Sequence, residues 1–586
     1  MLRFAQDIIS ALLGKRSSEE RENDAGNERP DLKRNKSEDV GPATNTDSPA
    51  VAESALGGGS ARPAPKFNYI LKVMNLPQGQ IKPTKKFFAD LGFNKIDKSP
   101  TKTFATITFD SEAKALDAQK AVDGLIYQQK YKIETEVMKR KEKVFKPRES
   151  KFANDTRTPT ERLADQVTPL HKLPYDEQLK KKHEVNTNHL SNIKRQLMNL
   201  PDLSQAGKEQ IAWAFEKTPR QLPCELAEPI ASPELNGYRT KCEFTIGKNI
   251  DGEKTVGFLL GLFKEGQTGV QEPSECLHIP DSAKKIAAAM ESYVRDSKYE
   301  VYDRVAKDGV YRGLLVRTPS TGEVMVLVQL KNDNMTTEEY EAEKKKIQDF
   351  WANFDQVKVK TLLLQTWNGQ SNGITDQAET QILFGDGYVT EELLGCKFRI
   401  SYNAFFQINT PATELLYQKC ADWCKLDPSK KTILLDLCCG TGTIGITMAK
   451  SVDKVIGVEI VPEAIVDAKA NAERNGITNV EYYASKVEDK LDVLTRSYDE
   501  EVVAILDPPR AGVHKSVIQA IRKSKIQRVI YVSCDAKQAR DNFLGLCRPS
   551  SNQYEGIPFR PKQAVSVDLF PHADPSELVI EFTRDI

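Results

Sequence analysis

The chain contains Thr432-Ile-Leu-Leu-Asp-Leu-Cys-Cys-Gly-Thr-Gly-Thr-Ile-Gly445, a segment typical of a strand that runs directly into a glycine-rich turn. A helix is predicted after the turn, then a strand over 454–459 that ends at Glu459, then a helix over 462–473. Glycines at such a turn let the backbone approach a nucleotide, and an acid about twenty residues later can bind ribose hydroxyls. The segment predicts a βαβ unit of a Rossmann-like domain that binds a nucleotide cofactor.

The glycine pattern by itself fits NAD and S-adenosylmethionine equally. A later segment, Glu501-Val-Val-Ala-Ile-Leu-Asp-Pro-Pro-Arg510, favours the second, because it predicts a strand that ends in Asp507 and two prolines. Two prolines cannot continue a central strand, so they fix a turn at its carboxyl end, where doubly wound folds place ligands. Such a turn is similar to the substrate-facing loop of nucleic-acid base methyltransferases. A tight turn without a further role is the alternative.

A third segment, Val529-Ile-Tyr-Val-Ser-Cys-Asp535, predicts a buried strand that carries Cys534 to its carboxyl end. A lone strand cysteine is usually an inert core residue. Three features favour a reactive thiol here: its place at the strand end, the expected nearness of Asp507, and the expected nearness of Arg510, which would favour the thiolate. Glu577, in a later short apolar run, supplies a carboxylate. A thiol and a carboxylate in a nucleotide-binding domain predict covalent chemistry on a bound substrate.

Five segments of the chain together resemble the RNA uracil-5-methyltransferase family, over about residues 225 to 586. In chain order they are Ser401-Tyr-Asn-Ala-Phe-Phe-Gln-Ile-Asn409, Asp436-Leu-Cys-Cys-Gly-Thr-Gly442, Asp507-Pro-Pro-Arg-Ala-Gly512, Tyr531-Val-Ser-Cys-Asp535 and Phe570-Pro-His-Ala-Asp-Pro-Ser-Glu577. The resemblance implies a methyltransferase dependent on S-adenosylmethionine. The cysteine set of bacterial relatives with an iron–sulfur cluster is missing, and Asp574-Pro-Ser576 stands where the family often has a second histidine.

The resemblance also implies roles for single residues. Cys534 matches the nucleophile that adds to uracil C6, and Glu577 matches the base that removes the proton from C5. The positions matching the cofactor-binding set are Gln407, Cys438, Glu459 and Asp507. Phe405 matches an aromatic beside the target base. Arg510 is also predicted to bind the substrate. Phe406 is equally well an ordinary core aromatic, and His572 either orients Glu577 or makes a structural hydrogen bond in its loop.

The amino-terminal part predicts a small α+β domain. Strands are expected over 69–74, 104–109 and 132–137, helices over 85–91 and 112–122, and there is room for another strand near Asn94 or Tyr127. This order resembles an RNA-recognition motif, a ferredoxin-type fold. That family stacks bases on aromatics at two or three sheet positions; here Lys72 and Thr106 occupy two of them and Phe104 remains. RNA contact and a docking role both stay open.

The whole chain is therefore predicted to be multidomain, α/β and α+β. The expected parts are a disordered tail at 1–65, a domain similar to the RNA-recognition motif at 66–140, a basic and helical connector at 141–220, a central β-rich domain at 221–395 and a Rossmann-like methyltransferase domain at 396–586. The basic run Lys139-Arg-Lys-Glu-Lys-Val-Phe-Lys-Pro-Arg148 favours contact with phosphate. The longest connector helix is expected over 179–200.

The composition of the chain limits which partners and which kinds of site it can have. The 83 basic and 83 acidic residues cancel, so a nucleic-acid surface must be a local patch. Ten cysteines without a Cys-x-x-Cys pair predict neither a disulfide scaffold nor a metal site. No apolar run reaches the ~20 residues of a membrane span. A monomer is favoured. A short basic cluster at Lys33-Arg-Asn-Lys36 suits a nuclear signal, and residence in the nucleus, the cytosol or both is predicted over mitochondrial targeting.

The predicted function is S-adenosylmethionine-dependent C5-methylation of uridine in RNA. The predicted target is the T-loop uridine of tRNA, and the sequence leaves open whether other RNAs are methylated too. It would proceed through a covalent adduct of Cys534 to C6. The alternative is an RNA-binding or tRNA-folding factor whose methyltransferase domain acts mainly as a clamp. An NAD-dependent oxidoreductase would leave Cys534 and the Asp507 turn without a role.

Overall fold

The computed structural model describes residues 67–141, apart from 94–95, 100–101, 110 and 129, and residues 156–585, apart from 202, 262–267, 370, 425–428, 491–492 and 494–499. The chain divides into two compact units, Met1–Lys146 and Pro147–Ile586, and each is described by itself. The tail predicted at 1–65 and most of the basic run that ends at Arg148 lie outside the described residues. The predicted domain bounds stay predictions.

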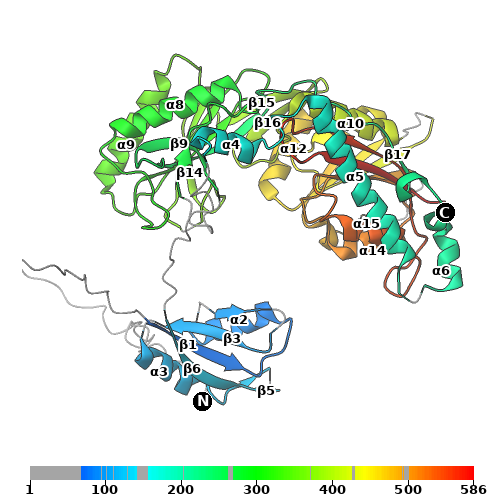
Figure 1. Cartoon of the computed structure of the whole chain (residues 1–586), viewed down its shortest axis with the longest axis horizontal. Coiled ribbons are helices and arrows are strands. Elements are labelled where there is room, and N and C mark those ends of the chain that lie inside the picture. Colours follow the sequence, from blue (N-terminus) through cyan, green and yellow to red (C-terminus); the bar gives the residue numbers. More distant parts are fainter. Residues whose placement is uncertain are drawn as a thin grey trace, which may run out of the picture. The chain divides into compact units, whose positions relative to one another are not determined.

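The first unit is a four-stranded antiparallel sheet with two helices (Figure 1). Its elements are β1 (Phe67–Met74), α2 (Ile81–Asp90), β2 (Ile96–Lys98), β3 (Ala105–Phe109), α3 (Glu112–Val122), the short strands β4 (Ile126–Tyr127) and β5 (Tyr131–Lys132), and β6 (Glu134–Lys141). The order in the sheet is β2-β3-β1-β6, as in split βαβ folds. The additional strands, β2 and the β4–β5 pair, lie near Asn94 and at Tyr127, the two places where the sequence allowed another strand. The likeness to an RNA-recognition motif stays a prediction.

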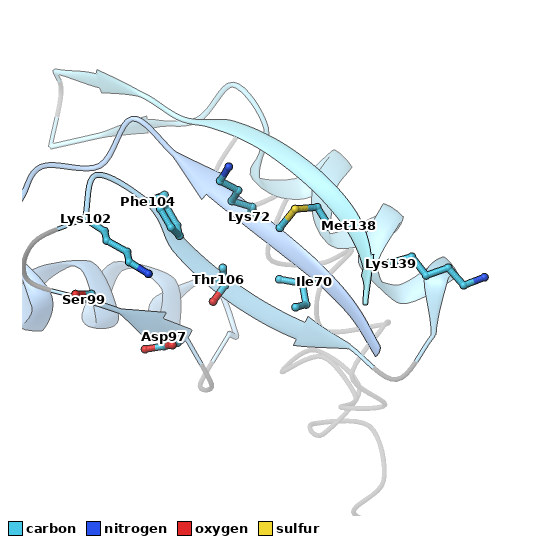
Figure 2. A pocket seen from close by; sticks show the side chains of 9 residues that line it. All are labelled: Ile70, Lys72, Asp97, Ser99, Lys102, Phe104, Thr106, Met138 and Lys139. Carbon is cyan, nitrogen blue, oxygen red and sulfur yellow. The ribbon is translucent and has the colours of Figure 1, made fainter. Parts of the chain in front are cut away.

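One face of this sheet is buried and the other is open. Leu71 and Val73 of β1 are buried in the core of the unit, whereas Lys72 between them belongs to the open face, which follows from the alternation of side chains along a strand. Figure 2 shows this open face, where a hollow of about 520 Å³ is lined by Lys72, Lys102, Phe104 and six further residues. The ammonium groups of Lys72 and Lys102 lie 5.2 and 5.1 Å from the centre of the Phe104 ring. Cationic side chains therefore share the open face with its aromatic ring.

The second unit begins with four helices, α4 (Pro159–Val167), α5 (Tyr175–Met198), α6 (Gln205–Gln210) and α7 (Ala212–Phe215). The sequence predicted a connector here, with its longest helix over 179–200. Helix α5 is instead part of the compact unit, because Leu190, Ile193 and Leu197 are buried in one of its hydrophobic clusters. Figure 1 shows α5 beside α15 (Arg540–Cys547), which it contacts.

A seven-stranded sheet follows, in the order β10-β9-β8-β11-β12-β13-β14. The strands are β8 (Lys241–Lys248), β9 (Lys254–Leu259), β10 (Val270–Gln271), β11 (Tyr311–Arg317), β12 (Met325–Leu330), β13 (Thr361–Thr366) and β14 (Glu379–Phe384). Helices α8 (Asp281–Asp296) and α9 (Thr337–Ala352) pack on one face, where Trp351 is buried. Leu315, Leu327 and Leu363 belong to a different cluster, which is shared with the hairpin β15 (Tyr388–Leu393) and β16 (Cys396–Ser401) and with the last sheet. The domain bound expected at 395/396 thus falls inside a hairpin that joins the two sheets.

The last sheet has the order β19-β18-β17-β20-β21-β23-β22-β7. Its strands are β7 (Glu225–Leu226), β17 (Thr432–Leu437), β18 (Lys454–Glu459), β19 (Val480–Ala484), β20 (Glu501–Leu506), β21 (Arg528–Ser533), β22 (Arg560–Val567) and β23 (Glu577–Thr583). Strands β17 to β21 pair in parallel, and β23 inserts antiparallel between β21 and β22. This is the Rossmann-like sheet that the sequence predicted.

Helices cover both faces of this sheet. α10 (Thr410–Cys424), α11 (Thr443–Met448) and α12 (Pro462–Arg474) contribute to one hydrophobic cluster, and α5, α14 (Lys515–Lys523) and α15 contribute to the other. The strand order reverses beside β17, because β18 lies on one side of it and β20 on the other. Ligands of open α/β sheets bind at the carboxyl ends of the strands at such a switch point. The fold therefore predicts a ligand site at the loops after β17, β18, β20 and β21.

Candidate active site

The loop after β17 is wound tightly. Cys438, Gly440 and Gly442 all have positive φ, at 68°, 54° and 80°. A Cβ on Gly442 would lie 2.6 Å from the Tyr482 hydroxyl, and one on Gly445 would lie 2.7 Å from Cγ1 of Val455. Gly442 is thus required by its conformation and by close packing. The N–H groups of Cys438 and of the following residue both donate to the Val458 carbonyl, at 2.9 and 3.1 Å, which ties the loop to β18.

Three carboxyl groups surround this loop. Glu459, at the end of β18, accepts hydrogen bonds from the N–H of Gly440 (3.1 Å) and of Val461 (3.0 Å). Asp436 is fully buried; one oxygen accepts from the Gly445 N–H at 2.9 Å, and the other has no hydrogen-bond partner among the residues that the structure describes. Burial, with Asp507 and Glu459 nearby, raises the pKa of Asp436 to about 7.

The third carboxyl group, Asp507, lies directly after β20. Burial raises the pKa of Asp507 to about 7, opposed by a side-chain hydrogen bond from Gln407. Gln407 belongs to the segment between β16 and α10, so the contact joins two separate parts of the unit. Three acidic groups around one loop suit a positively charged ligand and oppose a pyrophosphate.

Cys534 and Glu577 lie at the ends of two paired strands. Ser533 of β21 is opposite Leu578 of β23, so one further step brings Cys534 opposite Glu577. Glu577 is 2% exposed and its Oε2 has no hydrogen-bond partner among the described residues. Burial raises the pKa of Glu577 well above its usual range; Asp507 adds to this effect and Arg510 opposes it.

The thiol itself is held in its protonated form. Burial, with smaller contributions from Glu577 and Asp507, raises the pKa of Cys534 to about 11, and Arg510 opposes this shift. Arg510 therefore favours the thiolate, as expected, although the net pKa of Cys534 is raised. Two carboxyl groups on neighbouring strands and the burial of the thiol outweigh one exposed guanidinium.

The segment after β16 separates two adjacent phenylalanines. Phe405 is 66% exposed, whereas Phe406 is buried and its ring centre lies 5.9 Å from that of Phe398. Phe406 is thus a core aromatic, and Phe405 presents a free ring beside Gln407. The buried Arg317 holds this segment by donating to the carbonyls of Tyr402 and Ala404. No local sequence signal pointed to Arg317, because its partners lie more than eighty residues away.

His572 has a structural role in the loop before Glu577. Its N–H donates to Oε1 of Gln178 at 2.8 Å, its Nδ1 lies 3.2 Å from Nε2 of Gln178, and its Nε2 lies 3.1 Å from Oδ1 of Asn236. Both ring nitrogens therefore have partners other than Glu577. Of the two alternatives for His572, the structural hydrogen bond is the one present.

The described residues contain neither a group of metal ligands nor a membrane span. Among them no three His, Cys, Asp or Glu side chains are grouped so that they could hold a metal ion. In the same residues, no helix combines the length and the apolar character needed to span a bilayer. All ten cysteines lie in the described ranges and are free thiols.

Comparison with known proteins gives a consistent result. The tRNA (Uracil-5-)-methyltransferase family model matches residues 323–550. The human tRNA (uracil-5-)-methyltransferase homolog A is 39% identical over 437 residues, which cover 73% of this chain and 69% of that protein. The chain belongs to the tRNA (uracil-5-)-methyltransferase family. The human homolog B of this family is 37% identical, over 72% of this chain and 84% of its own length.

A solved structure supports the fold. The Pyrococcus abyssi tRNA (uracil-54, C5)-methyltransferase, in complex with S-adenosyl-L-homocysteine, superposes with a TM-score of 0.50 at 22% identity. The match covers 71% of this chain and 85% of that one. The two proteins therefore share the Rossmann-like fold.

Replacing Asp436 by Asn should make the stability of the second unit less dependent on pH. Because the folded-state pKa of Asp436 is raised from 3.8 to about 7, the folded state keeps a proton that the unfolded chain loses. The associated stability is present below pH 3.8 and is lost as the pH rises through 7, by on the order of 4 kcal/mol. The melting temperature of Asp436→Asn minus that of the wild type should therefore increase between pH 5 and pH 8.

Tryptophan fluorescence is a suitable signal, since all four tryptophans lie in the second unit. Asp541→Asn, at a side chain that is 82% exposed, is the control and should give a flat difference. A flat difference for Asp436→Asn as well would contradict the raised pKa.

Proposed function

We propose that this enzyme methylates C5 of a uridine in tRNA, at the T-loop position, by a covalent mechanism that uses Cys534 and Glu577. The observation that carries the proposal is the opposition of a thiol and a buried carboxyl group at the ends of β21 and β23, beside the glycine loop. The family supports a tRNA uracil substrate. The name of the Pyrococcus abyssi protein, a tRNA (uracil-54, C5)-methyltransferase, supports a single uridine of the tRNA as the target.

The cofactor that we assign is S-adenosylmethionine. Glu459 would hold its ribose hydroxyls, and Gln407, Cys438 and Asp507 would contact the rest of it around the glycine loop. The three carboxyl groups near this loop suit a positively charged cofactor, whereas the pyrophosphate of NAD would add two negative charges to an acidic site. The bound cofactor supplies an electrophilic methyl group on a positively charged sulfur.

Cys534 would begin the reaction. Uracil C5 is a poor nucleophile, but addition of the thiolate to C6 breaks the C5=C6 double bond and leaves an enolate, which makes C5 nucleophilic. The thiol must first lose its proton, and its pKa falls when positive charge is placed near Asp507 and Glu577. We infer that the thiol becomes reactive only in the loaded enzyme.

Glu577 would complete the reaction. After C5 has gained its methyl group, the carboxylate takes the C5 proton, the electron pair restores the C5=C6 bond, and the C6–S bond breaks to release Cys534. Burial raises the pKa of the Glu577 carboxyl group, which makes its ionised form a stronger base for such a proton transfer. Without this step the thiol would stay bound to the RNA.

Phe405 and Arg510 would bind the substrate. A uridine inside folded RNA must leave its stack to reach the thiol, and the exposed ring of Phe405 offers a surface on which the flipped base can stack. Arg510 is exposed and lies close enough to Cys534 and Glu577 to affect the pKa of both. Its guanidinium can hold a phosphate next to the reacting base.

A second candidate function is RNA binding or tRNA folding without catalysis. The lysines that line the open face of the first sheet favour it, since ammonium groups beside one aromatic ring can contact the RNA backbone (Figure 2). The two functions can coexist in one chain. A Cys534→Ala variant distinguishes the two functions, because it would lose methylation and retain tRNA binding and folding.

Wild-type enzyme, incubated with S-adenosylmethionine and tRNA that contains 5-fluorouridine, should form a stable protein–RNA adduct. Fluorine at C5 cannot leave as a proton, so release of Cys534 is blocked. The adduct is measured as a slow band on a denaturing gel. Cys534→Ala should give no such band, and Cys396→Ala, at another partly exposed cysteine, should give the wild-type amount. Absence of a band from the wild type would remove the covalent mechanism.

Glu577→Gln should trap an adduct with ordinary tRNA. Glutamine keeps the size of the side chain but does not accept the C5 proton, so turnover should fall by roughly 10²- to 10⁴-fold while addition of Cys534 continues. The adduct is followed on a gel and 5-methyluridine by mass spectrometry. Glu581→Gln is the matched control, since this buried carboxylate is on the same strand and contacts Arg528 and Gln563. Turnover of Glu577→Gln at the wild-type rate would rule out its role.

Glu459→Gln should weaken binding of radiolabelled S-adenosylmethionine by about tenfold or more, because a charged acceptor for the ribose hydroxyls is lost. Equilibrium dialysis measures the affinity. Glu473→Gln, on the exposed side of α12, is the control. NAD should not compete with the labelled ligand, and competition by NAD would contradict the cofactor assignment.

A further inference from the structure

The loop over 568–576 connects β22 to β23 and ends immediately before Glu577. Helix α5 holds this loop from outside the Rossmann-like sheet. It presents Tyr175, Gln178, Lys182 and Asn186 to the loop, at a spacing of three and four residues that places them on one side of the helix. All four side chains form hydrogen bonds with loop residues.

The central contact is a buried ion pair. Nζ of Lys182 lies 2.6 Å from Oδ1 of Asp568, and the two side chains are 2% and 1% exposed. The same ammonium donates to the Phe570 carbonyl at 2.8 Å, and the Tyr175 hydroxyl donates to the second oxygen of Asp568 at 3.0 Å. A buried pair of this kind adds little net stability, but it fixes geometry because either charge left alone is strongly disfavoured.

Two further contacts continue toward Glu577. Gln178 accepts from the backbone N–H of His572, a residue held at a φ of 69°. Asn186 donates to the Ser576 hydroxyl at 3.0 Å, one residue before Glu577. Since a non-glycine residue at positive φ is strained, the Gln178 contact maintains a loop path that the backbone does not prefer.

Helix α5 also approaches the nucleophile. His189 lies near enough to Asp535, the residue after Cys534, for that carboxylate to act on its pKa, which burial lowers. The same helix contacts α15, which follows Cys534 along the chain. One 24-residue helix thus spans the segment that follows the thiol and the segment that precedes the carboxyl group.

We propose that α5 sets the position of Glu577 relative to Cys534, and that Lys182 is the principal positioning residue. The inference rests on the proposed function of the pair. Oε2 of Glu577 has no hydrogen-bond partner among the described residues, and Glu577 starts β23 opposite Val567, which directly precedes Asp568. Both ends of the loop that α5 holds therefore lie next to Glu577. Loosening the loop should impair proton removal and release of the adduct, and should leave addition of Cys534 intact.

Lys182→Met tests this in the full-length enzyme. It keeps the length of the side chain and removes the charge, leaving Asp568 without its cation. With tRNA and S-adenosylmethionine, release of the adduct should slow by about tenfold or more, adduct formation should stay within about twofold of the wild type, and KM for tRNA should not change. Lys180→Met is the matched control, because Lys180 is on the same helix with its side chain 71% exposed. It should behave as the wild type.

Asn186→Ala provides a second, milder variant in case Lys182→Met lowers the melting temperature enough to limit the assay. It should show the same selective loss of release. Equal loss of adduct formation and release in these variants would mean a purely structural role and would overturn the inference. Wild-type release rates would overturn it too. Failure of the wild type itself to form an adduct with 5-fluorouridine RNA would instead overturn the proposed function.

Discussion

The parallel arrangement of β17, β18, β20 and β21 is the constraint on which the site depends, because it brings the residues after four strands to one edge of the sheet. At that edge the protein gathers acidic groups that have too few partners. Within the described part of the chain, one oxygen of Asp436 has no hydrogen bond, and the pKa of both Asp436 and Asp507 is raised to about 7. Such an arrangement is unfavourable in the empty protein and favourable with a cation bound. The site is therefore built around the charge of its ligand.

Local sequence signals predicted the strands of this sheet closely. The strands at 432–437 and 454–459 have the expected bounds, and the Asp507 turn follows its strand as the two prolines required. These signals depend only on neighbouring residues. The placement of Cys534 opposite Glu577 depends instead on β23 inserting antiparallel beside β21, which no local pattern specifies. The family resemblance, and not periodicity, supplied that pair.

Contacts between distant segments are what the sequence could not predict. Lys182 and Asp568 are separated by 386 positions, and nothing in the polar run around Lys182 distinguishes the buried lysine from its exposed neighbours. The net state of the thiol was hidden from the sequence for the same reason, although Arg510 acts in the expected direction. That direction follows from charge, but the net pKa of Cys534 depends on Glu577 and Asp507, which approach from two other strands. The hydrophobic cluster that both sheets of the second unit share is a further contact of this kind.

The burial that raises the pKa of Glu577 also raises the pKa of Cys534, which disfavours the thiolate. A low-polarity setting raises the pKa of the carboxyl group, which strengthens it as a base, and raises the pKa of the thiol to about 11, which removes the nucleophile. One fixed environment cannot favour both groups at once. Positive charge that arrives with the ligand lowers both pKa values together, so it favours the thiolate of Cys534 and the ionised form of Glu577, the form that can accept a proton. Under this scheme the thiol stays inert until the site is loaded, and geometry, maintained by the loop before Glu577, determines whether the adduct is then released.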